Sequence, residues 1–197
     1  MKKVVLFIVS MLMATTVFAE KVVGTYTMAE TSKDIEAAFD NKGVLKVYIE
    51  VLGEYKNDKV MIRIDGEQDL NEFIAQLKYC KAKFIEWDKV AKANNVTDYT
   101  KKYDVTFPNI EVWWRGSKWF STFKRNLFKP IFMVGDDGKA SFGVGGKATD
   151  WDNEYIDQQW YLILMSSAEF DSLINALNPE KIKSALKQGE NADALFQ

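Results

Sequence analysis

The sequence contains no histidine, and this absence excludes several large classes of enzyme and metal site. Catalytic triads of the Ser-His-Asp or Cys-His kind, histidine general bases and histidine-containing zinc sites all need an imidazole. The chain also lacks a G-x-S-x-G motif, a phosphate-binding P-loop and a G-x-G-x-x-G turn opening a helix. Catalysis would therefore have to use carboxylates, tyrosine, lysine or a Ser-Lys pair.

Cysteine and proline are almost as scarce. Cys80 is the single cysteine, so no intrachain disulfide can form and the stability of the fold must come from packing. With three prolines in the chain, no Pro-rich linker divides it. We therefore predict one domain over residues 20–189, preceded by a signal peptide at 1–19 and followed by a frayed tail at 190–197.

The first nineteen residues have the three parts of a secretory signal peptide. A two-lysine start precedes an apolar run from Val4 to about Ala14, and the small Ala19 stands before Glu20. The apolar run is shorter than the roughly 20 residues that span a bilayer. The sequence thus predicts an exported bacterial protein, periplasmic or secreted, whose mature chain starts at Glu20 and has no membrane span.

The net charge of the chain is −2, and loss of the signal lysines makes the mature chain more acidic. A nucleic-acid binder is expected to be basic, so this charge argues against nucleic acid as a partner.

The pattern of apolar residues predicts an α+β fold: an antiparallel sheet of roughly six to nine strands, packed on one long amphipathic helix, with two short C-terminal helices. The long helix is expected from Asp65, as N-cap, to Asn94-Asn95, because apolar residues recur at helical spacing. This stripe consists of Leu70, Phe73, Leu77, Cys80, Phe84, Trp87 and Ala91, with Ile74 beside them.

Strands are expected where short alternating runs are separated by turns. These runs are 22–28, 46–55, 60–65, 101–107, 109–115, 118–124, 129–135, 139–145 and 159–166. In the second and third runs, a two-residue loop at Asn57-Asp58 would pair Tyr55 with Val60 and place the apolar residues on one face. Residues 32–40 fit either a short helix or a strand, and the glycine-rich Gly143–Gly146 suggests a bulge or a strand end.

The C-terminal part carries two helix-start signals. Ser166 and Glu169 form a capping-box pattern for a helix to about Leu177. Asn178 and Pro179 then supply a cap and a first-turn proline for a helix to about Gln188.

The stretch 111–123, EVWWRGSKWFSTF, holds three of the six tryptophans and is named here the tryptophan hairpin. With a two-residue turn at 116–117, Trp113 would pair with Phe120 and Arg115 with Lys118. These four residues would then share one face, with an aromatic pair and two cations. Such a face favours an anionic or sugar-like ligand or a protein partner. Burial of the two rings beneath a helix or a strand is the structural alternative.

A second cluster is acidic: Asp150, Asp152, Glu154 and Asp157 lie within eight residues. Carboxylates at this density can hold Ca²⁺ or supply the acid and base of a glycosidase. The glycine and distal glutamate of an EF-hand loop are missing, so a solvated acidic turn is the simpler interpretation.

Three functions remain open at this stage. The first is an exported non-catalytic binding protein, without cofactor or metal, that uses Trp113, Arg115, Lys118 and Phe120 or the groove between the long helix and the sheet. Its partner would be a glycan, an anionic envelope component or a protein. The second is an envelope accessory or inhibitor protein that docks to one protein partner, and the third is a carboxylate-dependent hydrolase.

Overall fold

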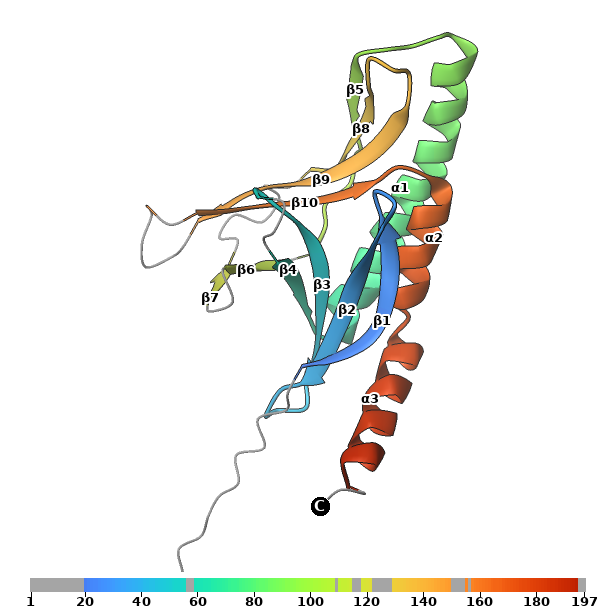
Figure 1. Ribbon diagram of the computed structural model, residues 1–197. Coiled ribbons are helices and arrows are strands. Elements are labelled where there is room, and N and C mark those ends of the chain that lie inside the picture. Colours follow the sequence, from blue (N-terminus) through green and yellow to red (C-terminus); the bar gives the residue numbers. More distant parts are fainter. Residues whose placement is uncertain are drawn as a thin grey trace, which may run out of the picture.

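The computed structural model describes residues 20–55, 59–108, 110–114, 118–121, 129–149, 155 and 157–194, with the backbone alone at 113–114, 118–121 and 189–194. Within these residues the chain forms ten strands and three helices (Figure 1). The strands are β1 (Lys21–Met28), β2 (Thr31–Phe39), β3 (Leu45–Gly53), β4 (Val60–Asp65), β5 (Tyr99–Lys102), β6 (Glu111–Trp114), β7 (Lys118–Ser121), β8 (Ile131–Val134), β9 (Ala140–Thr149) and β10 (Asp157–Leu164). The helices are α1 (Glu67–Ala93), α2 (Ser167–Ala176) and α3 (Pro179–Ala194).

The sheet branches at β3. The first part of β3 pairs with β2 and β4, and its last two residues, Leu52 and Gly53, pair with β10. One wing therefore runs β1-β2-β3-β4-β6-β7 and the other runs β10-β9-β8-β5, with every pairing antiparallel. The predicted α+β class with an antiparallel sheet is confirmed.

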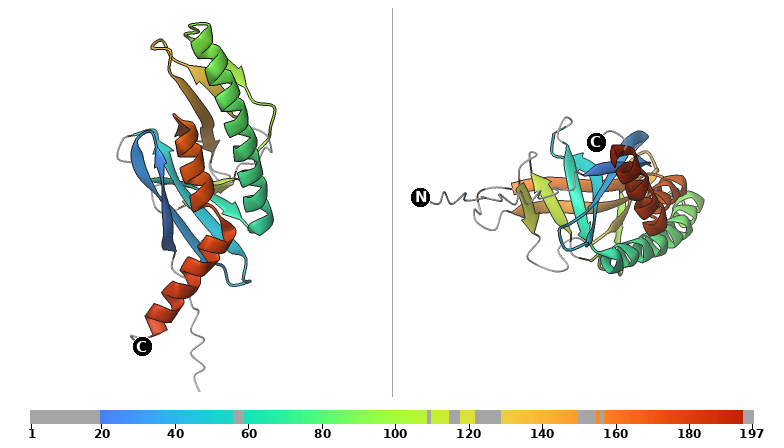
Figure 2. Two further views of the ribbon diagram at one scale, coloured as in Figure 1. Left: turned by 90° about the vertical axis from the view of Figure 1, so that its right-hand side faces the viewer. Right: turned by 90° about the horizontal axis from the view of Figure 1, so that it is seen from below.

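The helices gather on one side of the strands (Figure 2). The apolar stripe of α1 is buried as predicted, from Leu70 to Ala91, with Trp87 only half-buried near its end. Phe170 of α2 packs between α1 and the second wing, with ring centroids 5.6 Å from Phe84 and 5.0 Å from Phe142. One continuous core thus joins both wings to the helices.

Residues 31–39 form strand β2, so the helical alternative is wrong there. Ile35 and Ala37 belong to the main core, whereas Ala38 belongs to a small cluster on the other side of the sheet, and this alternation of faces fits a strand. Residues 35–37 of β2 pair with both β1 and β3, so the sheet satisfies their backbone groups on both sides.

The hairpin of β3 and β4 has a different register from the predicted one. Val51, not Tyr55, pairs with Val60, and Tyr55 is 63% exposed. The shift is an even number of residues, so the apolar side chains stay on the core face as expected. Met61, on the opposite face, is also buried, in a small cluster with Ala38 and Tyr48.

Helix α1 does not use the predicted N-cap. Its N-cap is Gly66, without a side-chain cap, since Asp65 is the last residue of β4 and pairs with Lys46 and Arg63. Ser166 does cap α2, because its hydroxyl accepts a hydrogen bond from the N–H of Glu169. The amide oxygen of Asn178 accepts from the N–H of Lys181, and α3 continues past the expected end near Gln188.

The glycines at 143–146 lie inside β9, so the expectation of a bulge or a strand end there is wrong. The register of β9 with β10 is continuous here, and Gly145 pairs with Tyr161. A Cβ at Gly145 would lie 2.2 Å from the carbonyl oxygen of Trp160, so this glycine permits close approach of the neighbouring backbone.

Candidate functional site

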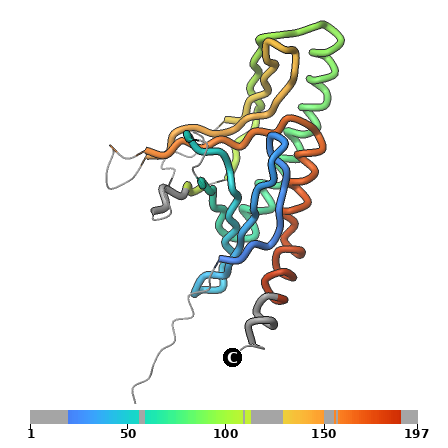
Figure 3. Tube along the Cα trace, viewed as in Figure 1, coloured from blue at the N-terminus to red at the C-terminus, as the bar shows by residue number. Residues whose placement is uncertain are grey.

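A cleft of about 800 Å³ opens beside the C-terminal half of α1, and we name it the helix cleft. Four segments far apart in sequence line it: the β1–β2 turn, one side of α1, the β8–β9 turn and the start of α2. The lining residues are Ala29, Glu30, Phe84, Ile85, Asp88, Lys92, Gly138, Lys139, Ala140, Met165, Ser166, Ser167 and Glu169. The path of the chain brings the β1–β2 turn next to the start of α2 at this point (Figure 3).

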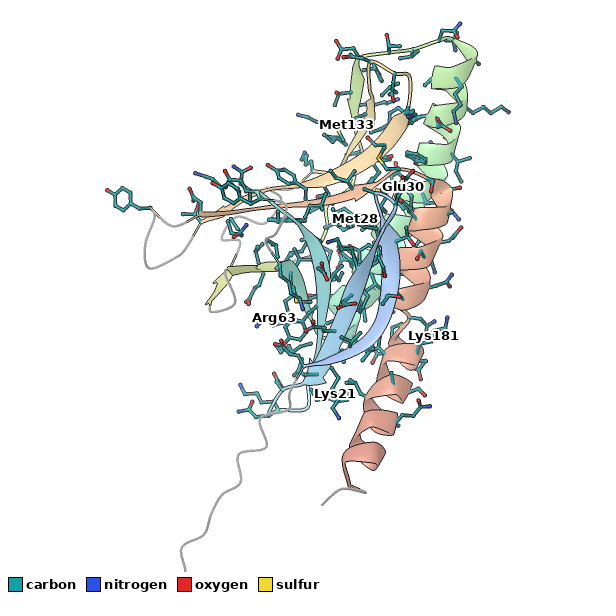
Figure 4. The ribbon with its side chains drawn as sticks, in the orientation of Figure 1. Lys21, Met28, Glu30, Arg63, Met133 and Lys181 are labelled. Carbon is teal, nitrogen blue, oxygen red and sulfur yellow. The ribbon has the colours of Figure 1, made fainter. Side chains whose placement is uncertain are left out.

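The β1–β2 turn reaches the cleft in a strained conformation. Ala29 and Glu30 have φ values of 47° and 63°, the left-handed region that a type I′ hairpin turn requires at both central residues. Neither is the Asn or Gly that adopts this region at little cost. The turn is held by the hydroxyl of Thr31, which donates to the Met28 carbonyl at 2.7 Å, and Glu30 lies at its tip (Figure 4).

Glu169 anchors this turn to α2. Its side chain is buried, and its two carboxylate oxygens accept from the N–H of Glu30 at 3.1 Å and of Met165 at 2.5 Å. The predicted capping box is therefore only half formed. The Ser166 hydroxyl caps the helix. The Glu169 side chain, however, accepts from the N–H groups of Met165 and Glu30 instead of from the N–H of Ser166.

The lining of the cleft combines apolar side chains with charges of both signs. Ile85 and Met165 are 49% and 41% exposed, so each presents apolar surface to the solvent. The ammonium of Lys92 pairs with Asp88 at 2.7 Å. Lys139 pairs with Asp137 at 3.1 Å, and a hydrogen bond from its backbone N–H lowers the pKa of that carboxyl.

These groups suit reversible binding. Hydroxyls, carboxylates and ammonium groups around an apolar surface can orient a ligand that has one apolar face and polar edges. In the described part of the chain, no three His, Cys, Asp or Glu side chains are grouped so that they could hold a metal ion. None of the described helices has the length and apolarity needed to cross a bilayer.

A smaller crevice of about 290 Å³ lies on the other side of α1, and we name it the Trp87 crevice. Its lining is mostly apolar and comes from the end of α1, the following loop, β5 and β8. The residues are Trp87, Val90, Ala91, Asn94, Val96, Tyr99, Lys101 and Phe132. The Phe132 ring lies 5.9 Å from Phe84 and 5.7 Å from Trp87, so an aromatic wall separates the crevice from the helix cleft.

The tryptophan hairpin forms from β6 and β7, but in a different register from the predicted one. Trp113 pairs with Trp119, and Phe120 pairs with Val112. Trp114 pairs with Lys118, so three residues and not two separate the paired ends, a common alternative hairpin length. The expected pairing of Trp113 with Phe120 is therefore wrong, and so is their shared face, because Phe120 takes the register position opposite Val112 and Trp113 the one opposite Trp119. Arg115 lies outside the described residues.

The acidic segment 150–154 also lies outside the described residues. Asp157, at its end, is the first residue of β10, and its carboxylate is already engaged. Lys147 donates to it at 2.7 Å and the hydroxyl of Thr149 at 2.9 Å, and the lysine hydrogen bond lowers the pKa of Asp157.

The sequence contained little signal for either concave site. The expected groove between the long helix and the sheet shares α1 with the helix cleft but included none of the turn residues that line it. The capping-box pattern at Ser166 and Glu169 marked one edge of the helix cleft, with a different role for the glutamate. Comparison with protein-family models, curated proteins and solved structures finds no match for the chain.

Proposed function

We propose that the protein is an exported, non-catalytic binding protein and that its ligand occupies the helix cleft. The observation that carries this proposal is the convergence of four separate segments on one concave site with an apolar surface and a polar rim. Ligand sites in proteins are typically of this size and composition. Export to the periplasm or the medium is supported by the signal-peptide pattern at residues 1–19.

The chemistry of the cleft favours a ligand with hydroxyl or amide groups around an apolar face, such as a glycan or a peptide segment. The carboxylates of Glu30 and Asp88 can accept hydrogen bonds from it. The ammonium groups of Lys92 and Lys139 and the hydroxyl of Ser167 can donate to it. Because the rim holds both signs of charge, it does not select a ligand by net charge alone.

The tryptophan hairpin is a second candidate surface for the same function. Its composition supports this, since three tryptophans come with Arg115 and Lys118 in a chain that is acidic as a whole. It would favour an anionic envelope component or a protein partner, and in the latter case the protein would act as an accessory factor or inhibitor.

Affinity capture from a bacterial envelope and growth-medium extract tests the proposal, with bound glycan and bound protein both analysed. The bait is the mature chain from Glu20 in four forms: wild type, Ile85→Lys in the cleft, Tyr79→Lys as a control, and the double variant Trp113→Ala/Phe120→Ala. Tyr79 lies on the same helix, is 40% exposed and does not line the cleft. Thermal unfolding of each form establishes that it is folded.

Loss of the ligand in the Ile85→Lys form alone would support the helix cleft. Loss in the hairpin double variant alone would move the site to the tryptophan hairpin. Retention by all four forms, or by none, would contradict both locations.

A further inference from the structure

We propose that the Trp87 crevice binds a small amphiphilic anion, with its apolar body in the crevice and its carboxylate or sulfonate held by Lys101. This site is separate from the helix cleft and does not depend on the function proposed there. The size of the crevice, the exposure of its lining and the surroundings of the Lys101 ammonium support this assignment.

The crevice is open and apolar. Val90 is 56% exposed and Tyr99 is 46% exposed, so both present apolar surface to water beside the half-buried Trp87. Covering such surface with an apolar ligand is favourable. The volume of about 290 Å³ is roughly twice that of an apolar cavity of ~150 Å³ known to take benzene, so a two-ring body fits.

Lys101 provides the charge that selects the ligand. Its ammonium nitrogen lies 4.3 Å from the centroid of the Trp87 ring. No carboxylate among the described residues lies within ion-pair distance of it, whereas Lys92 on the adjoining helix pairs with Asp88 at 2.7 Å. An ammonium has three N–H donors and the ring face takes at most one of them, so Lys101 can still bind an anion.

The end of α1 does not compete for this position. Its last carbonyls accept hydrogen bonds from the backbone that follows, including Val96 N–H to Ala91 at 3.0 Å and Asn94 N–H to Val90 at 3.2 Å. These bonds satisfy carbonyls that would otherwise attract a cation. The positive charge of Lys101 would repel a cationic ligand, so the crevice favours an anion.

Isothermal titration of the mature chain with 2-naphthoate tests the proposal. Its neutral and cationic analogues, 2-naphthamide and (2-naphthyl)trimethylammonium, have the same two-ring body. Lys101→Gln tests the cation, and Lys102→Gln, its neighbour on β5, is the control for it. Val90→Glu tests the apolar lining, and Val22→Glu is the control for it. Val22 is 58% exposed, close to Val90, and lies on β1 away from the crevice.

We expect 2-naphthoate to bind more tightly than both analogues. Lys101→Gln should weaken its binding about two- to five-fold and bring it to the level of 2-naphthamide, while Lys102→Gln has no effect. Val90→Glu should abolish binding, because it places a carboxylate in the crevice, and Val22→Glu should not.

Equal binding of naphthoate and naphthamide, or an unchanged affinity in Lys101→Gln, would overturn the role of the cation. Tighter binding of the trimethylammonium analogue would show an aromatic cation site instead. Absence of binding by all three probes, or full binding by Val90→Glu, would overturn the crevice as a site. Since Lys101 is exposed, its variant remains informative even if Val90→Glu does not fold.

Discussion

The carboxylate of Glu169 accepts a hydrogen bond from the backbone N–H of Glu30 at 3.1 Å, across 139 residues of sequence. Its other oxygen accepts from the N–H of Met165, and the side chain is almost fully buried. One residue therefore connects the start of α2 to the strained β1–β2 turn, and both segments line the helix cleft. The shape of the cleft depends on this connection.

Replacing Glu169 by alanine should destabilise the protein by about 3 kcal/mol, because two part-buried N–H donors lose a charged acceptor. The melting temperature should fall by roughly 6–12 °C. Glu169→Gln keeps one acceptor oxygen and should lose about half as much. Thermal unfolding of the three proteins checks this order, and an alanine variant as stable as the wild type would show that water replaces the carboxylate.

The strands of the first wing show what alternation can and cannot predict. The core face of β3 and β4 follows from the alternation of Val47, Ile49 and Val51 with more polar residues. The register does not follow, because any even shift keeps the same face. The tryptophan hairpin differs by one residue from its predicted register, and there the shift changes which residues pair across the strands.

The helix cleft could not be predicted from local patterns. Its residues come from four segments whose proximity is created by the branched sheet, and this branching depends on the pairing of β3 with β10 at Leu52 and Gly53. Likewise, nothing near Asp65 in sequence showed that Lys46 and Arg63 would engage its carboxylate and leave Gly66 as the N-cap. The long apolar stripe of α1 was predictable because helix periodicity is local.

Gly145 should not tolerate a side chain. A Cβ there would lie 2.2 Å from the carbonyl oxygen of Trp160 and 2.9 Å from the Cα of Tyr161, so the β10 backbone would have to move. We expect Gly145→Ala to cost about 3 kcal/mol or more in urea unfolding. Gly24→Ala on β1 is the control, since its Cβ would meet only Ala176, at 4.0 Å, and its effect should stay within about 1 kcal/mol.

Cys80 should be unreactive in the folded protein. It is fully buried on α1, and burial raises the pKa of its thiol to about 12, so both access and thiolate are lacking at neutral pH. Labelling by a thiol reagent at pH 8 should therefore require unfolding and should accelerate in urea. Ala93→Cys, at the exposed end of α1, adds a thiol that should label rapidly without denaturant. Rapid labelling of the wild type would mean that α1 opens readily from the sheet.

The turn between β2 and β3 should make stability depend on acid. The Asp40 carboxylate accepts from the N–H groups of Val44 and Lys42, each at 2.9 Å, and lies 3.6 Å from the ammonium of Lys46. The Val44 hydrogen bond is the largest cause of a lowered pKa at Asp40. A carboxyl with a lowered pKa in the folded state stabilises the fold above its unfolded pKa of about 3.9, and this contribution is lost as the pH falls through the folded value.

Asp40→Asn keeps an oxygen that can accept both backbone hydrogen bonds but removes the charge that titrates. Wild type should therefore be more stable than this variant at pH 6, and the difference should shrink as the pH falls from about 4 towards 2. Urea unfolding at pH 6 and pH 2.5 measures the two differences, with Glu54→Gln as a control for loss of one exposed negative charge. Acid removes the charge of Asp40 but leaves the geometry of the turn unchanged. A stability difference that stays constant over this pH range would therefore mean that the geometry of the turn, and not the charge of Asp40, determines what this residue contributes to stability.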